Sequence, residues 1–238
     1  MNTPDMDFIE HVEELRKRLI ISMAAFLLLF LLSFIFVQDI YRWLIKDLTL
    51  ELAVLGPGDI LWVYVVLAGI LATAGTIPVM AHQVWLFVRP ALEPREQKAT
   101  LVYMPLFFIL FAVGLCFGYL VIFPMVYHFL LSLSDGMFMT FFTVERYFRF
   151  LINITLPFGF LFELPIIIMF LTSLGILNPN RLKKGRKYAY FFLIVLAVLI
   201  TPPDFILDIL VIIPLLFLYE CSIQLSVLVY KRKYNLTN

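Results

Sequence analysis

The sequence is poor in the residues from which disulfide frameworks and metal centres are built. Its 238 residues include two cysteines and three histidines. Cys116 and Cys221 lie inside or beside apolar runs, where we expect small packing residues and not a disulfide or a metal ligand. The histidines are scattered without metal-ligand spacing, at His11, His82 and His128. We therefore predict no metal and no other cofactor.

Charged residues are scarce as well. They make up 15% of the chain, against 63% hydrophobic residues, whereas soluble domains carry about 25% charged and about 45–50% apolar residues. This composition excludes an ordinary soluble domain and predicts an all-α polytopic membrane protein. The net charge of +1 gives no overall attraction for nucleic acid, so no nucleic-acid partner is expected.

The chain also lacks the motifs of common enzymes. It contains no Gly-rich phosphate loop, no nucleotide-binding fingerprint and no internal repeat. No Ser/His, paired-Asp or zinc-ligand arrangement falls at membrane depth. The sequence therefore disfavours an intramembrane enzyme, and we predict a protein without enzymatic activity.

What the sequence does contain is a series of long apolar segments, which we interpret as a single transmembrane domain over residues 1–238. Six segments are predicted to span the membrane: about 19–37, 60–88, 101–126, 150–174, 188–200 and 205–220. The first has no small-residue cleavage site and is expected to remain as a helix. The fifth would cover only about 20 Å, less than the roughly 30 Å hydrocarbon core. We expect it to form a short hairpin with the sixth, in locally thinned membrane.

Two connecting segments are unusually apolar. Residues 39–52 mix Trp43 and Leu44 with Arg42 and Lys46, a pattern typical of an amphipathic helix lying in the membrane interface. Residues 127–149 are predicted to form a periplasmic loop that packs on the membrane surface.

The distribution of Lys and Arg predicts the orientation. Of the 18 such residues, 14 lie in the N-terminal segment, the 89–98 and 181–187 loops and the C-terminal tail. Because cytoplasmic loops carry the excess of positive charge, both termini are predicted to be cytoplasmic.

One carboxylate stands near the middle of a predicted span. Glu163 is the only ionisable residue of the segment 150–174 and lies close to its midpoint, where a charge costs roughly 2.5–3.5 kcal/mol on insertion scales. We expect it to face other helices or a wet cavity and not lipid. Pro157 and Pro165 predict a kink around it, and Gly159 one turn earlier would leave space beside it. The alternative is a structural polar contact between two helices.

Two acidic stretches meet at the predicted cytoplasmic face. One contains Glu14 within HVEELRKRL, residues 11–19, and the other contains Glu96 within QVWLFVRPALEPRE, residues 83–96. Acidic groups beside apolar residues at a membrane surface could receive a cationic peptide followed by an apolar one. The alternative is a pair of solvated flanks with ordinary intrahelical pairs such as Glu14 with Arg18.

These two motifs, together with FELP at 162–165 and LITPPD at 199–204, resemble the TatC family, the multi-spanning subunit of the twin-arginine protein translocase. The resemblance covers nearly the whole chain in order. It implies six transmembrane helices in a concave, cupped bundle with both termini cytoplasmic, in the inner membrane of a prokaryote. It also implies a core receptor that binds twin-arginine signal peptides, nucleates a translocon with the single-span subunits TatB and TatA, and exports folded proteins using the proton-motive force. The resemblance also implies contact with membrane lipid and possible association with further copies of the chain.

The resemblance also implies roles for particular residues. The signal-peptide site would comprise Glu14, Arg16, Phe87 and Glu96. Glu163 would be the intramembrane polar residue, and the periplasmic turn would comprise Pro202, Pro203 and Asp204. One departure is Asp208, where the family pattern has an uncharged polar residue such as Gln.

A competing interpretation is a proton- or ion-coupled transporter that uses Glu163 as its relay. It requires a second buried ionisable partner at matching depth, and the first three predicted spans show none.

Overall fold

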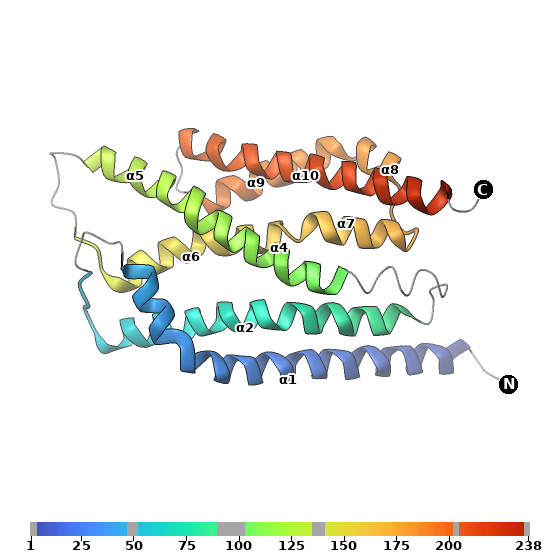
Figure 1. The fold of residues 1–238 in the computed structure, drawn as a ribbon, viewed down its shortest axis with the longest axis horizontal. Helices are drawn as coiled ribbons and strands as arrows, with labels where there is room; N and C mark the ends of the chain where they lie inside the picture. Colours follow the sequence, from blue (N-terminus) through green and yellow to red (C-terminus); the bar gives the residue numbers. More distant parts are fainter. Residues whose placement is uncertain (1–3, 47–51, 90–102, 135–140, 202–204, 236–238) are drawn as a thin grey trace. The chain divides into compact units, whose positions relative to one another are not determined.

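The computed structural model describes residues 4–46, 52–89, 103–134, 141–201 and 205–235, and the predicted all-α class is confirmed for them. Within these ranges the one extended pairing is a bridge between Ala53 and Thr143. The helices, shown in Figure 1, are α1 Pro4–Ile45, α2 Pro57–Val88, α4 Tyr103–Phe117, the π-helix η2 Gly118–Ile122, α5 Phe123–Ser134, α6 Val144–Leu161, α7 Leu164–Ser173, α8 Pro179–Lys184, α9 Arg186–Ile200 and α10 Phe205–Asn235.

The helices belong to two compact units. The first contains α1, α2 and the beginning of α4, and the second contains residues 52–55, the remainder of α4 and every later helix. The short segment 52–55 joins the second unit through its backbone. Ala53 N donates to Phe142 O at 3.0 Å, and Val144 N donates to Ala53 O at 2.9 Å.

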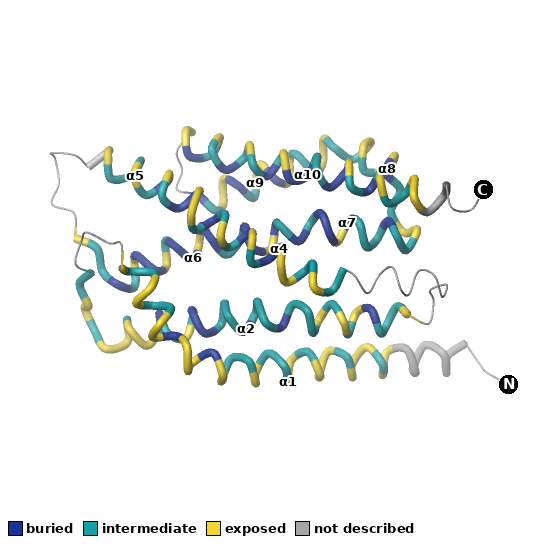
Figure 2. The backbone as a smooth tube through the Cα atoms, in the orientation of Figure 1, coloured by how far each residue is buried: buried dark blue, intermediate teal, exposed yellow. Residues whose placement is uncertain are grey.

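Several helices are long and apolar enough to cross a membrane. In the described residues there are five such stretches: Val12–Ile45, Pro57–Val88, Tyr103–Ser132, Val144–Ser173 and Phe205–Arg232. Many large apolar residues along them are exposed, and such outward apolar faces suit lipid. Figure 2 colours the exposed positions of the chain yellow. Helix α9 has 15 residues, about 22 Å at 1.5 Å per residue. A sixth crossing by α9, and the orientation of the termini, stay predictions.

Helix α1 extends beyond the expected first span. We expected the first span to end at Val37, before a separate amphipathic segment at 39–52, but α1 runs without a break to Ile45. The physical reason is that no Pro or Gly interrupts residues 38–45, so the helical hydrogen bonds continue. The last turns of α1 bend away from its longer part (Figure 1). Their place in the membrane interface stays a prediction.

Other helices also extend beyond the expected spans. The expected loop 127–149 is helical at both ends, because α5 continues to Ser134, where the Ser-Asp-Gly turn signal begins, and α6 starts at Val144. Thr143 caps α6 by accepting a hydrogen bond from Arg146 N at 3.3 Å. Helix α10 continues past residue 220 to Asn235, since no helix breaker follows Pro214. The short hairpin arm begins at Arg186, two residues before the expected start.

Small residues let the helices of each unit approach closely. In the first unit, α1 packs along α2 (Figure 1), and a Cβ added at Gly75 would lie 3.1 Å from Leu29 Cδ1. In the second unit, a Cβ at Gly114 would lie 2.5 Å from the Phe158 carbonyl oxygen. Such glycines permit backbone-to-backbone packing of apolar helices, where larger residues would hold them apart.

Gly159 has a different role from the one predicted. We expected it to leave room beside Glu163, but a Cβ there would lie 2.9 Å from Phe111 and 3.0 Å from Leu115. The space is filled by α4, so Gly159 serves helix packing.

Candidate functional site

The N-terminal acidic motif lies on α1 beside the end of α2. Arg18 Nη2 donates to Glu14 Oε1 at 3.0 Å, and Arg18 Nη1 donates to Gln83 Oε1 at 3.3 Å. The i,i+4 pair that the alternative interpretation named is therefore present, and the same guanidinium also links the two helices. The side chains of Arg18 and Glu14 are 24% and 34% exposed. Glu14 is thus held in place yet open to a ligand.

Gln83 is the residue of this region that sequence reasoning missed. It belongs to the quoted motif, but we assigned no role to it. Its contact partner Arg18 lies 65 residues away in the chain, and only the antiparallel course of α1 and α2 brings the two together. In the folded chain, Arg18 lies 27 residues before the end of α1 (45 minus 18) and Gln83 lies 26 residues after the start of α2 (83 minus 57).

The remaining predicted peptide-site residues are placed as follows. Phe87 is half-buried on α2, one turn beyond Gln83 and on the same face of the helix. Arg16 is exposed on α1. Glu96 lies outside the described residues. The structure therefore brings Glu14 to the helix end that carries Phe87.

An aromatic and cationic stack accompanies these residues on α2. Trp85 is buried, its ring centroid lies 6.1 Å from that of His82, and the Arg89 guanidinium lies 5.3 Å from the Trp85 ring. The stack holds Arg89 close to the helix end, where α2 stops.

Glu163 occupies a break between two helices. Helix α6 ends at Leu161 and α7 begins at Leu164, so the predicted kink is confirmed. Pro165 explains its position, since its ring clashes with the carbonyl group four residues earlier, which belongs to Leu161. The Glu163 carbonyl oxygen then starts α7 by accepting from Ile166 N at 3.1 Å and Ile167 N at 2.9 Å.

The Glu163 side chain is buried and lacks a hydrogen-bond partner. The residue is 6% exposed, and neither carboxylate oxygen is hydrogen-bonded to any described residue. Thr155 Oγ1 on the same helix pair is also buried without such a partner. Buried polar groups are normally satisfied, so the Glu163 carboxyl group is an exception among the described residues.

The hairpin of α9 and α10 has its own polar contacts. Pro202, Pro203 and Asp204 lie outside the described residues. Beside them, Thr201 Oγ1 lies 2.6 Å from Asp208 Oδ1 and 3.0 Å from the Ala197 carbonyl oxygen. Asp208, the departure from the family pattern, therefore has a partner inside the chain.

A second network at the opposite end of this hairpin was not predicted. Arg186 Nη2 donates to Glu220 Oε2 at 2.7 Å, and the Tyr190 hydroxyl donates to Glu220 Oε1. The Tyr219 hydroxyl donates to the Leu182 carbonyl oxygen at 3.2 Å, which ties α8 to α10. These pairs are 30 or more residues apart, so periodicity could not reveal them.

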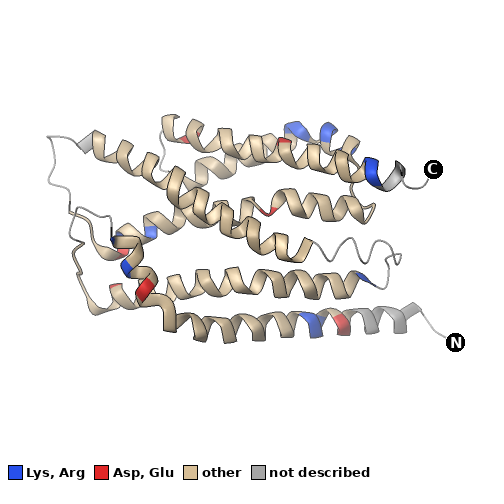
Figure 3. Cartoon of the chain, viewed as in Figure 1, with Lys and Arg blue, Asp and Glu red and all other residues tan. Residues whose placement is uncertain are grey.

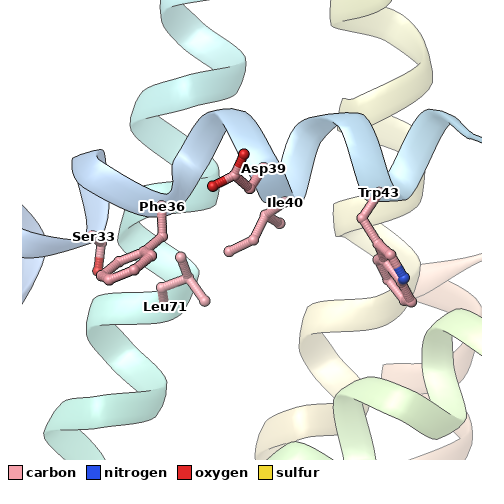
Figure 4. A pocket seen from close by; sticks show the side chains of 6 residues that line it. All are labelled: Ser33, Phe36, Asp39, Ile40, Trp43 and Leu71. Atoms are coloured by element: carbon pink, nitrogen blue, oxygen red, sulfur yellow. The ribbon is translucent and has the colours of Figure 1, made fainter.

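The first unit also contains an open pocket. Its volume is about 440 Å³, and six residues line it: Ser33, Phe36, Asp39, Ile40, Trp43 and Leu71. Phe36 and Leu71 lie at one end and Trp43 at the other (Figure 4). In the part of the chain that the structure describes, no three His, Cys, Asp or Glu side chains gather as a metal site would require.

Helices of membrane-spanning length, ionisable groups gathered near helix ends (Figure 3) and one buried carboxylate in a broken helix define a multi-pass membrane protein. The family model of Sec-independent protein translocase protein (TatC) matches residues 10–214. The chain belongs to this family, as the motifs predicted, and is therefore a component of a bacterial Sec-independent protein translocase.

Relatives and solved structures agree with this assignment. TatCd of Bacillus subtilis (strain 168) is 58% identical over 233 residues, covering 98% of this chain and 96% of that protein. TatCy of the same organism is 42% identical over 238 residues, covering 98% and 93%. A crystal structure of the twin-arginine translocase receptor TatC matches with a TM-score of 0.78 at 32% identity, covering 92% of this chain and 99% of that one.

Proposed function

We propose that this chain is the receptor subunit of a twin-arginine translocase. It binds signal peptides with two consecutive arginines at a cytoplasmic site that includes Glu14 and Glu96. It then nucleates assembly with the single-span subunits TatA and TatB, and the complex exports folded proteins using the proton-motive force. The carrying observation is the partly exposed Glu14 carboxylate, fixed beside the end of α2 within a family match that includes both acidic motifs.

The chemistry of the site suits arginine. A guanidinium presents a planar fork that matches a carboxylate, whereas a lysine ammonium is a compact point charge. A carboxylate offers about four lone-pair sites, so Glu14 can accept a second guanidinium while Arg18 holds it at Oε1. Each peptide arginine would gain roughly 1.5–3 kcal/mol if partly desolvated, and less if exposed.

The apolar part of the signal peptide needs a path beside the helices. Phe87, half-buried next to Gln83, offers the first apolar contact. Glu163 would supply the deeper polar group that keeps the interior of the protein hydrated. The six-span arrangement with both termini in the cytoplasm is part of this proposal, and the bias of 14 among 18 cations supports it.

Site-specific cross-linking tests the proposal. Photoreactive residues at positions 13, 97 and 163, which leave Glu14 and Glu96 intact, should capture a twin-arginine precursor. Capture at 13 and 97 should fall sharply when lysines replace both arginines. Equal capture of the twin-lysine precursor at these positions would contradict the proposed site.

One observation favours a second candidate, a proton- or ion-coupled transporter. Glu163 is buried with both oxygens unbonded to described residues, as a relay group would be. Solute or ion transport by the purified chain alone in proteoliposomes, abolished by Glu163→Gln, would favour this candidate over the receptor.

A further inference from the structure

The most basic surface of the second unit lies outside the residues proposed for peptide binding. It comprises α8 and the first turn of α9, which carry five cations between residues 181 and 187. Four of them are exposed: Arg181, Lys183, Lys184 and Lys187. Figure 3 shows this concentration as the blue segments of α8 and its neighbour. We call these four residues the α8 basic cluster.

Local structure holds the cluster in place. Asn178 caps α8, since its Oδ1 accepts from Asn180 N at 2.9 Å, and Pro179 is buried at the first helical position. The hydrogen bond from the Tyr219 hydroxyl to Leu182 O fastens the other side of the short helix to α10. The basic side chains are thus presented on the outer side of a fixed helix.

The charge of the cluster is not neutralised within the described residues. Glu220 is the nearest acid along this hairpin, and its two oxygens are already bonded to Arg186 and Tyr190. The Lys187 ammonium lies 4.9 Å from the Tyr188 ring, a contact that adds no negative charge. Four positive charges therefore stay available for an anionic partner.

The surface next to the cluster is apolar and aromatic. Along the first turns of α9, Tyr188, Phe191 and Phe192 are 69%, 70% and 64% exposed. Tyrosine is enriched at the level of lipid headgroups, and the exposed phenylalanines offer apolar surface to the acyl chains below. Helix α9 is only about 22 Å long, which is shorter than the hydrocarbon core. Lipid headgroups must therefore come close to α8, at the start of α9.

We propose that the α8 basic cluster binds the phosphates of anionic phospholipids, with their acyl chains against the exposed aromatic face of α9. An acidic protein would match the charge but not the adjoining aromatic surface, so the lipid is the better fit. Each cation near an anionic surface raises affinity by roughly fivefold, and salt screens the attraction. The lipid site shares no residue with the proposed peptide site.

Native mass spectrometry of the purified full-length chain tests this inference. Phosphatidylglycerol and phosphatidylcholine with identical acyl chains are titrated against the wild type and the triple variant Arg181→Gln, Lys183→Gln, Lys184→Gln. A matched control removes three cations from the C-terminal tail, with Lys231→Gln, Arg232→Gln and Lys233→Gln. The expected result is a loss of phosphatidylglycerol affinity of at least about tenfold in the cluster variant and under about threefold in the control.

Phosphatidylcholine retention should be the same in all three proteins. Unchanged phosphatidylglycerol affinity in the cluster variant, or an equal loss in the tail control, would overturn the proposal. A poly-glutamate peptide that displaces phosphatidylglycerol from the wild type at equal concentration would also overturn it, in favour of an acidic partner. If the triple variant does not fold, a salt titration of the wild type decides. Raising the salt concentration from about 0.05 to 0.5 M shortens the Debye length on the order of threefold. Phosphatidylglycerol retention must fall over this range, and phosphatidylcholine retention must not.

Discussion

Arg18 donates a hydrogen bond of 3.0 Å to Glu14, which lies one turn earlier on α1. The same guanidinium donates to Gln83 of α2 at 3.3 Å. A carboxylate that an intramolecular arginine already holds has a fixed orientation before any ligand arrives. Preorganisation of this kind lowers the entropy that binding must overcome.

Replacing Glu14 should separate binding from stability. In Glu14→Gln, affinity for a twin-arginine peptide should fall by roughly ten- to a hundredfold, the equivalent of one charge-assisted contact. The unfolding temperature should change little, because a partly exposed i,i+4 pair contributes only about 0.3–0.5 kcal/mol. Peptide binding in nanodiscs and thermal unfolding in detergent measure the two quantities.

The chain offers a matched control on α6. Glu145 pairs with Arg149 at 2.5 Å with the same i,i+4 spacing, so Glu145→Gln removes an equivalent pair elsewhere. It should leave peptide affinity unchanged. Equal losses of affinity in the two variants would argue against a specific role for Glu14.

Replacing Glu163 should move stability and export in opposite directions. Glu163→Leu removes two buried oxygens that are unbonded to described residues, so it should stabilise the fold by about 1–3 kcal/mol. Export of a twin-arginine precursor should nevertheless be lost, while Glu163→Gln should retain more export because it keeps a neutral polar group. Export assays in cells and thermal unfolding test this pair, and full export by the Leu variant would show that no polar group is needed.

The glycine contact between α4 and α6 should tolerate no side chain. Gly114→Ala would place Cβ 2.5 Å from the Phe158 carbonyl oxygen, which is backbone and cannot rotate away. We expect a destabilisation of about 1–3 kcal/mol from overpacking. Gly58→Ala is the control, since nothing lies within 4 Å of its added Cβ. Thermal unfolding of both variants should show a loss only at Gly114, and equal melting temperatures would refute close packing there.

The hairpin contact of Thr201 should depend on its hydroxyl group. Thr201→Val keeps the shape but leaves the Asp208 carboxylate without the partner at 2.6 Å, at a cost of about 1–3 kcal/mol. Thr201→Ser keeps the hydroxyl and should retain most of the stability. A Val variant as stable as the Ser variant in thermal unfolding would show that the contact contributes nothing.

The parts of the fold that follow from local chemistry were predictable. Apolar runs identified the long helices. Pro165 located the break beside Glu163, because a proline ring in a helix always clashes with the carbonyl group four residues earlier, here that of Leu161. The end of α1 was harder to predict. The amphipathic pattern at 39–52 does not indicate whether the preceding helix stops at Gln38 or continues.

Long-range pairs could not be derived in the same way. The contacts of Arg18 with Gln83 and of Arg186 with Glu220 join residues 65 and 34 positions apart, and they depend on how helices are arranged. Gly159 illustrates a related limit. The sequence shows that a small residue stands there, but not whether helix α4 or the Glu163 carboxylate requires the space. Glu96 and the turn residues 202–204 lie outside the described residues, so their roles stay predictions.

The most direct test of the account is a thermodynamic cycle between the acidic site and the peptide. Affinities of twin-arginine and twin-lysine signal peptides are measured for the wild type and for the double variant Glu14→Gln, Glu96→Gln in nanodiscs. The account predicts that lysine substitution weakens binding at least about tenfold in the wild type and has almost no further effect in the double variant. An arginine preference of the same size in both proteins would place the recognition of the guanidinium pair elsewhere and contradict the account.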